Sequence, residues 1–216
     1  MNERAKELGM NDTHFVNCTG LPADGHVTSA YDIALMSREL ILHHPDIRRF
    51  TTIWMDSLRD GASMLVNTNK LIRFYEGATG LKTGSTSSAK YCISATAERD
   101  GMELIAVVLG GSTSDARFSD AKALLSYGFA NYALVTAAPE APLPALPVVL
   151  GAQRTVQTVL TPDNALLLEK NRANGLAQSV TLPESVEAPV EAGESLGTLD
   201  IFDAGGASVA SLPLLA

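Results

Sequence analysis

Four prolines fall within the nine residues from Pro139 to Pro147, and this segment constrains the fold more than any other feature of the chain. Proline fixes φ and has no backbone N–H, so the segment cannot form the interior of a helix and favours a stiff, extended connection. The charge also changes here, from 13 Lys and Arg against 15 Asp and Glu before Pro139 to 3 against 9 from Pro139 onward. We therefore predict a first domain over residues 1–137, a proline-rich linker over 138–147 and a second domain over 148–216.

Helical and strand patterns alternate in the first domain. Ser29 resembles the start of a capping box, and apolar residues follow it at helical spacing until Pro45. Asp100-Gly101 lies between two β-like runs and predicts a hairpin. The same criteria predict a short helix over residues 2–8, strands near 51–54 and 65–66, and an amphipathic helix over 114–132. Helices and strands in this order indicate an α/β or α+β fold.

The second domain has the pattern of an all-β structure. Short apolar runs recur along it and are separated by turn residues, and the segment Asp203–Gly206 predicts a final hairpin. This spacing is typical of a small sandwich or barrel.

Composition excludes several classes of protein. With a net charge of −8 and no basic cluster, the chain lacks the surface that binds nucleic-acid phosphates. No apolar run approaches the ~20 residues of a membrane-spanning helix, and the N-terminus does not have the pattern of a secretory signal. Cys18 and Cys92 match no metal or redox spacing, and either a single bridge or two free thiols would fit their number. We expect no cofactor and no metal.

The triplet Lys82-Thr83-Gly84 is the candidate site of the first domain. It offers a cation, a hydroxyl and a residue without a Cβ, followed by strand amides that can donate hydrogen bonds. Such a set suits a ligand that ends in a carboxylate. Three residues alone are a weak signal, because a surface turn with an exposed lysine can have the same sequence. The neighbouring segments strengthen it.

Four segments carry a resemblance to a known family. They are Phe-Val-Asn at 15–17, Thr-Gly-Leu-Pro at 19–22, His-Val-Thr-Ser-Ala-Tyr-Asp at 26–32 and Gly-Leu-Lys-Thr-Gly-Ser-Thr at 80–86. The chain resembles the low-molecular-mass penicillin-binding proteins that are serine-type D-alanyl-D-alanine carboxypeptidases. The resemblance implies an α+β fold, with a partial β-lactamase/penicillin-binding (transpeptidase-like) domain followed by a small all-β sandwich domain.

The family uses three motifs, of which only Lys-Thr-Gly is in place. Ser-x-x-Lys supplies the nucleophile and its base, and Ser-x-Asn transfers protons. Both should precede the helix over residues 2–8, so we expect the chain to be the C-terminal portion of such an enzyme and to be inactive alone. Two matches to Ser-x-x-Lys, Ser87–Lys90 and Ser119–Lys122, come after Lys-Thr-Gly. We expect neither to supply a nucleophile.

The resemblance implies a role for each site residue. Lys82 would face the missing nucleophile and stabilise the charge that develops during acyl transfer. Thr83 would hydrogen-bond the terminal carboxylate of the substrate, and Gly84 would allow close backbone contact. The backbone N–H of Ser85 would be half of the oxyanion hole. Arg117 would help to hold the carboxylate of the C-terminal D-alanine, and an exposed arginine at a helix start is the alternative for it.

Partners and location follow from the same resemblance. The substrate would be a peptidoglycan stem peptide ending in D-Ala-D-Ala, and β-lactams would acylate the same serine of the full-length parent. The parent would act at the extracytoplasmic face of the bacterial membrane, and no membrane anchor is visible in this chain. Two alternatives stay open: a non-catalytic cell-wall-associated binding or spacer module, and a carrier domain modified at Lys170.

Overall fold

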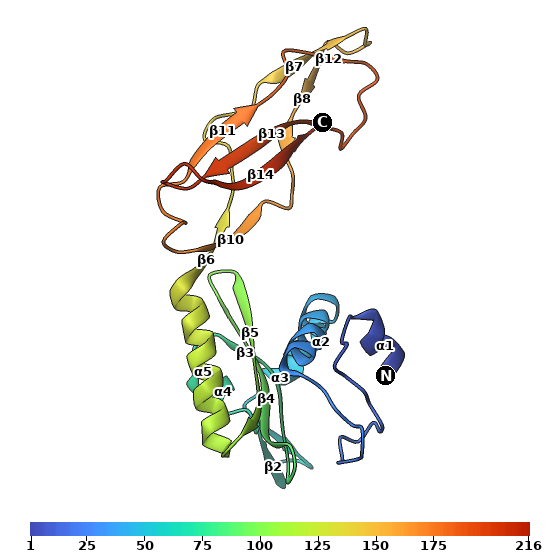
Figure 1. Cartoon of the computed structure of the whole chain (residues 1–216), viewed down its shortest axis with the longest axis vertical. Helices are drawn as coiled ribbons and strands as arrows, with labels where there is room; N and C mark the ends of the chain where they lie inside the picture. Colours follow the sequence, from blue (N-terminus) through green and yellow to red (C-terminus); the bar gives the residue numbers. More distant parts are fainter. The chain divides into compact units, whose positions relative to one another are not determined.

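The chain folds into two compact units. The computed structural model describes all 216 residues and divides them into Met1–Phe129 and Ala130–Ala216. Figure 1 labels most elements of both units. No helix in the structure has both the length and the apolar character needed to cross a membrane.

An antiparallel sheet of three strands forms the centre of the first unit. The strands β3 (Ala78–Thr86), β4 (Lys90–Arg99) and β5 (Met102–Gly111) lie in the order β3-β4-β5. The hairpin predicted at Asp100-Gly101 is confirmed, since it joins β4 to β5. β3 is therefore an edge strand, with one side free of any strand partner.

Two helices cover the two faces of this sheet (Figure 1). α2 (Ala30–His43) begins after Ser29, whose side chain accepts a hydrogen bond from the backbone N–H of Asp32 at 3.2 Å, as the capping box predicts. α5 (Ser114–Asn131) matches the amphipathic helix predicted over 114–132. Because β4 is central and covered on both faces, its residues 93–97 are all buried, without the alternation of a half-exposed strand.

Shorter elements surround the sheet. They are α1 (Asn2–Glu7), the 3₁₀ turn η1 (Pro45–Ile47), α3 (Arg48–Thr51), β1 (Met55–Leu58), β2 (Ser63–Val66) and α4 (Leu71–Phe74). The strand predicted near residues 51–54 is wrong, because Thr51 ends the helix α3. Its hydroxyl donates to the carbonyl oxygen of Thr79 in β3 at 2.7 Å, and this tertiary contact outweighs the strand preference of a β-branched residue.

The second unit is built from strands, as predicted. β13 (Ser195–Phe202) and β14 (Ser208–Leu215) form the predicted final hairpin, and β11 (Ala177–Thr181) and β9 (Val159–Leu160) complete a sheet in the order β11-β13-β14-β9. Its core contains alternate residues of the central hairpin: Leu199, Ile201, Leu212 and Leu214. The remaining strands of this unit are β6 (Tyr132–Thr136), β7 (Ala145–Val149), β8 (Thr155–Gln157), β10 (Ala165–Glu169) and β12 (Val186–Glu187).

The second unit starts earlier along the chain than the predicted domain boundary at residue 137. β6 follows α5 directly and pairs with β10, so these residues belong to a sheet of the second unit. β7 begins at Ala145, within the predicted linker over 138–147, and pairs with β8. The prolines and the change in charge therefore lie downstream of β6, the first strand of the second unit.

Asp203 organises the turn of the final hairpin and gives a testable pH dependence. Its carboxylate accepts hydrogen bonds from the backbone N–H of Ala207 at 3.0 Å and of Gly205 at 3.1 Å, and it pairs with Arg172. The Ala207 hydrogen bond is the largest cause that lowers the pKa of Asp203 below its usual 3.8, and Arg172 adds to it. The unfolded chain therefore takes up this proton at a higher pH than the folded chain does.

We expect Asp203→Asn to flatten the acid side of the pH–stability profile. In the wild type, the stability linked to Asp203 is fully present above pH 3.8 and is lost as the pH falls through the lowered pKa of the folded state. Thermal melts followed by circular dichroism over a pH series measure this. The control is Asp163→Asn, because Asp163 is exposed and has no hydrogen-bond partner. Identical profiles for wild type and Asp203→Asn would contradict the prediction.

Candidate active site

The triplet Lys82-Thr83-Gly84 lies on the edge strand β3, next to the free side of the sheet. Two side chains from the segment before α4 hold this strand. The amide of Asn69, which is 2% exposed, donates to the carbonyl oxygen of Gly80 at 2.9 Å. Thr68 contacts the hydroxyl of Thr83. The edge is therefore fixed by side chains where no further strand fixes it.

Lys82 projects from the face of the sheet that α2 covers. In the register of β3 and β4 it lies opposite Ser94, whose hydroxyl is 2.7 Å from the hydroxyl of Ser37 in α2. Residues opposite each other on paired strands point to the same face. The Lys82 Nζ donates to the carbonyl oxygen of Thr83 at 2.5 Å, and no carboxylate of the chain pairs with it. Lys82 thus keeps an uncompensated positive charge beside the edge.

Thr83 is largely buried, with 7% of its surface exposed. Its Oγ1 lies 2.7 Å from the Oγ1 of Thr68, and either hydroxyl can be the donor. A hydroxyl carries one proton and two acceptor lone pairs, so Thr83 can donate either to Thr68 or to a ligand. When Thr68 is the donor, the proton of Thr83 remains available to an anion at the edge.

Gly84 has open space where a side chain would be. A Cβ added there would meet no atom within 4 Å, and its φ is not in the left-handed region. Neither packing within the chain nor backbone strain therefore requires glycine at this position. The next residue, Ser85, is exposed and pairs with Tyr91 of β4. The absent side chain leaves the backbone of residues 84–85 accessible to a molecule at the edge of the sheet.

Arg117 reaches β3 and β4 from α5 and is 7% exposed, so it is not the exposed arginine of a helix start. Its Nη1 donates to the carbonyl oxygens of Gly84 at 3.0 Å and of Cys92 at 3.2 Å. The guanidinium carbon lies 4.8 Å from the ring centre of Phe118 and 5.6 Å from that of Tyr91. The structure thus brings Arg117 to the Lys82–Ser85 segment. Its contact partner Gly84 lies 33 residues earlier in the chain.

The charge of Arg117 has no counter-ion within the chain. Its partners are neutral carbonyl groups and aromatic rings, its Nε has no hydrogen-bond partner, and no carboxylate forms an ion pair with it. Buried charges in proteins are ordinarily paired, because removing them from water is costly. Arg117 and Lys82 approach the edge strand from opposite faces, and both favour an anion next to Gly84.

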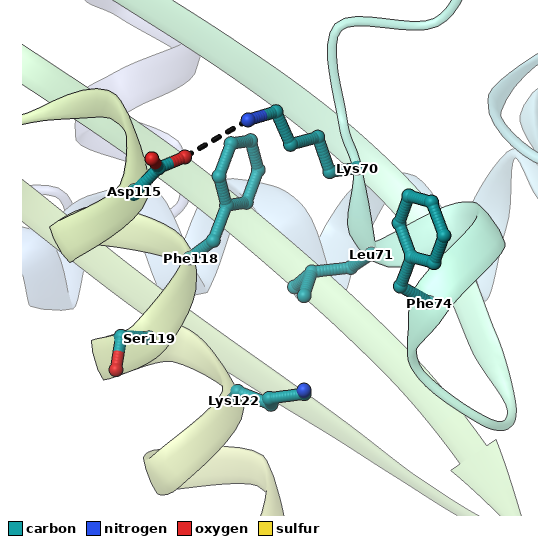
Figure 2. Close-up of a pocket in the computed structure, with 7 residues that line it drawn as sticks. All are labelled: Lys70, Leu71, Phe74, Asp115, Phe118, Ser119 and Lys122. Carbon is teal, nitrogen blue, oxygen red and sulfur yellow. Dashed lines mark hydrogen bonds and ion pairs between the residues drawn. The ribbon is translucent and has the colours of Figure 1, made fainter.

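The two late Ser-x-x-Lys matches do not form nucleophile–base pairs. Ser87 lies in the turn between β3 and β4, and no hydrogen bond joins it to Lys90. Ser119 and Lys122 are exposed on α5, and Figure 2 shows their side chains pointing apart. A serine is activated when its hydroxyl lies within hydrogen-bonding distance of a base, and neither pair meets this condition.

Sequence reasoning missed three residues that shape the site. Neither Thr68 nor Asn69 stands out in the sequence, yet they anchor β3. Tyr91 contacts the guanidinium of Arg117 because the hairpin register places it opposite Ser85. The predicted hairpin at Asp100-Gly101 joins β4 to β5 and does not set this β3–β4 register. The contacts of Thr68 and Asn69 likewise depend on tertiary structure. Cys18 and Cys92 are free thiols.

Comparison with known proteins identifies the relatives of this chain. A family model described as D-alanyl-D-alanine carboxypeptidase matches residues 1–113, and one described as penicillin-binding protein 5, C-terminal domain matches residues 141–216. D-alanyl-D-alanine carboxypeptidase DacF of Bacillus subtilis is 37% identical over 221 residues, covering 100% of this chain and 56% of the relative. DacC of Escherichia coli is 32% identical and is covered to 54%. The chain spans about half the length of the curated relatives it matches.

Solved structures have the same fold. Penicillin-binding protein 5 from Haemophilus influenzae superposes with a TM-score of 0.75 at 25% identity, over 99% of this chain and 62% of that one. Penicillin-binding protein D2 from Listeria monocytogenes, in its cefotaxime-bound form, gives a TM-score of 0.55 at 40% identity, over 59% of this chain and 53% of that one. The fold class predicted from the sequence, α+β with a transpeptidase-like first part, is confirmed.

Proposed function

The chain belongs to the D-alanyl-D-alanine carboxypeptidase family, and from this membership we propose that its first unit is the anion-binding part of a serine-type D-Ala-D-Ala carboxypeptidase site. The observation that carries the proposal is Arg117, a buried cation without a counter-ion beside Lys82-Thr83-Gly84. A peptide ending in D-Ala-D-Ala supplies one carboxylate, which can pair with the positive charge of Arg117. The second unit would be the β-rich domain that follows the catalytic domain.

The proposed reaction proceeds through an acyl-enzyme. A serine oxygen forms an ester with the carbonyl carbon of the penultimate D-alanine, the C–N bond breaks, and the nitrogen leaves protonated as free D-alanine. Water then hydrolyses the ester and regenerates the serine. We assign the nucleophile to a Ser-x-x-Lys motif outside these 216 residues, since neither pair within them has the required geometry.

Each site residue has a part in this scheme. Lys82 and Arg117 would attract the terminal carboxylate, and the Thr83 hydroxyl would donate to it. The backbone N–H of Ser85 would stabilise the oxyanion that forms when the carbonyl is attacked, which the open space at Gly84 permits. β-Lactams would bind in the same place, and a stem peptide of peptidoglycan would be the substrate. The complete enzyme would then act on the outer side of the bacterial cytoplasmic membrane.

Three measurements test the proposal on the 216-residue chain. We expect its intact mass to be unchanged after incubation with benzylpenicillin, and we expect no D-alanine to be released from an acyl-D-Ala-D-Ala peptide. NMR titration should nevertheless detect binding of that peptide, and its C-terminal carboxamide analogue should bind more weakly. Lys82→Gln should reduce the difference between the two peptides, with Arg117 still favouring the carboxylate, whereas Lys6→Gln, which changes an exposed lysine of α1, should leave it unchanged.

Two results would count against this assignment. A covalent adduct with the mass of one penicillin would mean that a serine within these residues is activated. Equal binding of the free acid and the carboxamide by the wild-type chain would mean that the edge of β3 does not recognise a carboxylate.

A further inference from the structure

A cavity of about 260 Å³ lies between α4 and the first turns of α5, outside the candidate active site. Leu71 and Phe118 line it and are 3% and 7% exposed, and Phe74 lines it and is 63% exposed. Figure 2 shows Leu71 and Phe118 pointing into the space between the two helices. The interior of the cavity is therefore apolar, while one aromatic side chain at its margin is accessible to solvent.

The two ends of the cavity differ in charge. At one end the Lys70 Nζ pairs with the Asp115 carboxylate at 2.8 Å and lies 5.8 Å from the ring centre of Phe118. The two charges of this pair cancel, so this end of the cavity has no net charge. Lys122 lines the other end and has no hydrogen-bond or ion-pair partner in the chain. In Figure 2 its side chain extends toward the space between the helices. The cavity thus combines an apolar interior with one unpaired cation.

Size and charge together define the ligand. Drug-sized ligands occupy cavities of about 300–1,000 Å³, and a cavity of ~150 Å³ is large enough for benzene. A space of about 260 Å³ therefore holds one ring with a short substituent, and is too small for a peptide chain. A single carboxylate matches the single unpaired ammonium of Lys122. We propose that this cavity binds a small monocarboxylate with one apolar ring, with the ring against Phe118 and Leu71 and the carboxylate at Lys122.

Both walls of the cavity are attached to β3, the strand that carries the candidate active site. The segment before α4 holds β3 through Thr68 and Asn69, and α5 holds it through Arg117. Arg117 also stacks on Phe118, which lines the cavity. A ligand that shifts the ring of Phe118 changes the support of Arg117. The binding proposal itself does not depend on the proposed carboxypeptidase function.

The probe for this site is 4-fluorophenylacetate, observed by ¹⁹F NMR in the presence of the 216-residue chain. We expect saturable binding with a Kd on the order of 1 mM, as is usual for a ligand of this size. Trp54 provides a second signal, because its ring lies 5.9 Å from that of Phe74 and it is the only tryptophan of the chain. Binding should change its fluorescence over the same concentration range.

Matched variants test both halves of the proposed ligand. Lys122→Gln should weaken binding of the acid about two- to fivefold and leave the neutral 4-fluorophenylacetamide unaffected, while Lys6→Gln should change neither. Phe74→Ala should weaken both probes. The matched control is Phe50→Ala, since Phe50 is similarly exposed at 67% but does not line the cavity.

Four outcomes would overturn the proposal: absence of saturation, equal effects of Lys122→Gln and Lys6→Gln, equal effects of Phe74→Ala and Phe50→Ala, or loss of probe binding in Lys82→Gln. The last result would place the probe at the edge of β3 instead. It would leave the proposed carboxypeptidase site standing, so failure of one proposal can be distinguished from failure of the other.

Discussion

An Arg117→Met variant is expected to bind an acyl-D-Ala-D-Ala peptide about 10- to 100-fold more weakly than the wild-type chain does, since a hydrogen bond to a charged group contributes roughly 1.5–3 kcal/mol. The carboxamide analogue should bind equally to both proteins. Methionine has a long flexible side chain that fills much of the space of arginine, so the variant removes the charge and leaves the packing against Phe118 and Tyr91 largely in place.

The same substitution should change stability little. It removes two hydrogen bonds to the carbonyl oxygens of Gly84 and Cys92, but it also removes a buried charge that has no counter-ion. These effects oppose each other. A site residue whose loss costs binding more than it costs folding is the signature of a group retained for function.

Arg99→Met is the matched control for this variant. Arg99 lies between the rings of Tyr75 and Phe129, 4.6 Å from each ring centre, and donates to the carbonyl oxygen of Glu76. Like Arg117, it contacts two aromatic rings and a backbone carbonyl, but it is half-buried and contacts none of the β3 residues of the site. We expect Arg99→Met to lower the melting temperature and to keep the preference for the free acid. NMR titrations measure the binding of the acid and the carboxamide by both variants, and thermal melts measure their stability. Acid binding by Arg117→Met as tight as that of the wild type would refute the assignment.

The second large effect concerns Gly197, near the start of β13 in the second unit. A Cβ at this position would lie 2.2 Å from the backbone carbonyl oxygen of Thr181 and 2.7 Å from Leu182 Cδ2. The carbonyl cannot move without disturbing the pairing of β11 with β13, because Thr181 lies opposite Thr198 in that ladder. We expect Gly197→Ala to destabilise the second unit by about 3 kcal/mol, at the upper end of overpacking effects.

The chain contains its own internal reference for this measurement. Its single tryptophan, Trp54, lies in the first unit, so its fluorescence follows that unit, while circular dichroism follows both. We expect the dichroism transition of the second unit to fall by about 4–8 °C per kcal/mol, with the tryptophan transition unmoved. Gly205→Ala is the control, since its nearest contact would be a side-chain oxygen at 3.4 Å. Equal melting of the two variants would show that β11 and β13 accommodate the added carbon.

Local signals in the sequence predicted much of the fold correctly. The capping serine of α2, the amphipathic spacing of α5 and the Asp-Gly turn before β5 each depend on residues close together in the chain. The strand expected near residues 51–54 failed for the opposite reason. Thr51 is held in α3 by the carbonyl of Thr79, 28 residues away, and no local pattern reports that contact.

The residues of the candidate site were chosen from the sequence, whereas their surroundings were not foreseen. Residue types pointed to Lys82-Thr83-Gly84, and the family resemblance pointed to Arg117. The structure brings these residues together at one edge of the sheet. The sequence did not indicate that Arg117 is buried and that backbone carbonyls occupy its Nη1. Burial depends on how α5 packs against the sheet, and this is decided by contacts among distant residues.

The direct passage from α5 into β6 has a consequence for building hybrid proteins. Strand β6 supplies the antiparallel partner of β10, yet it lies upstream of the prolines. A hybrid that joined two relatives at the prolines would pair the β10 of one parent with the β6 of the other. A junction near residue 130 would instead transfer the whole β unit with its own partner strands, at the place where the two compact units divide.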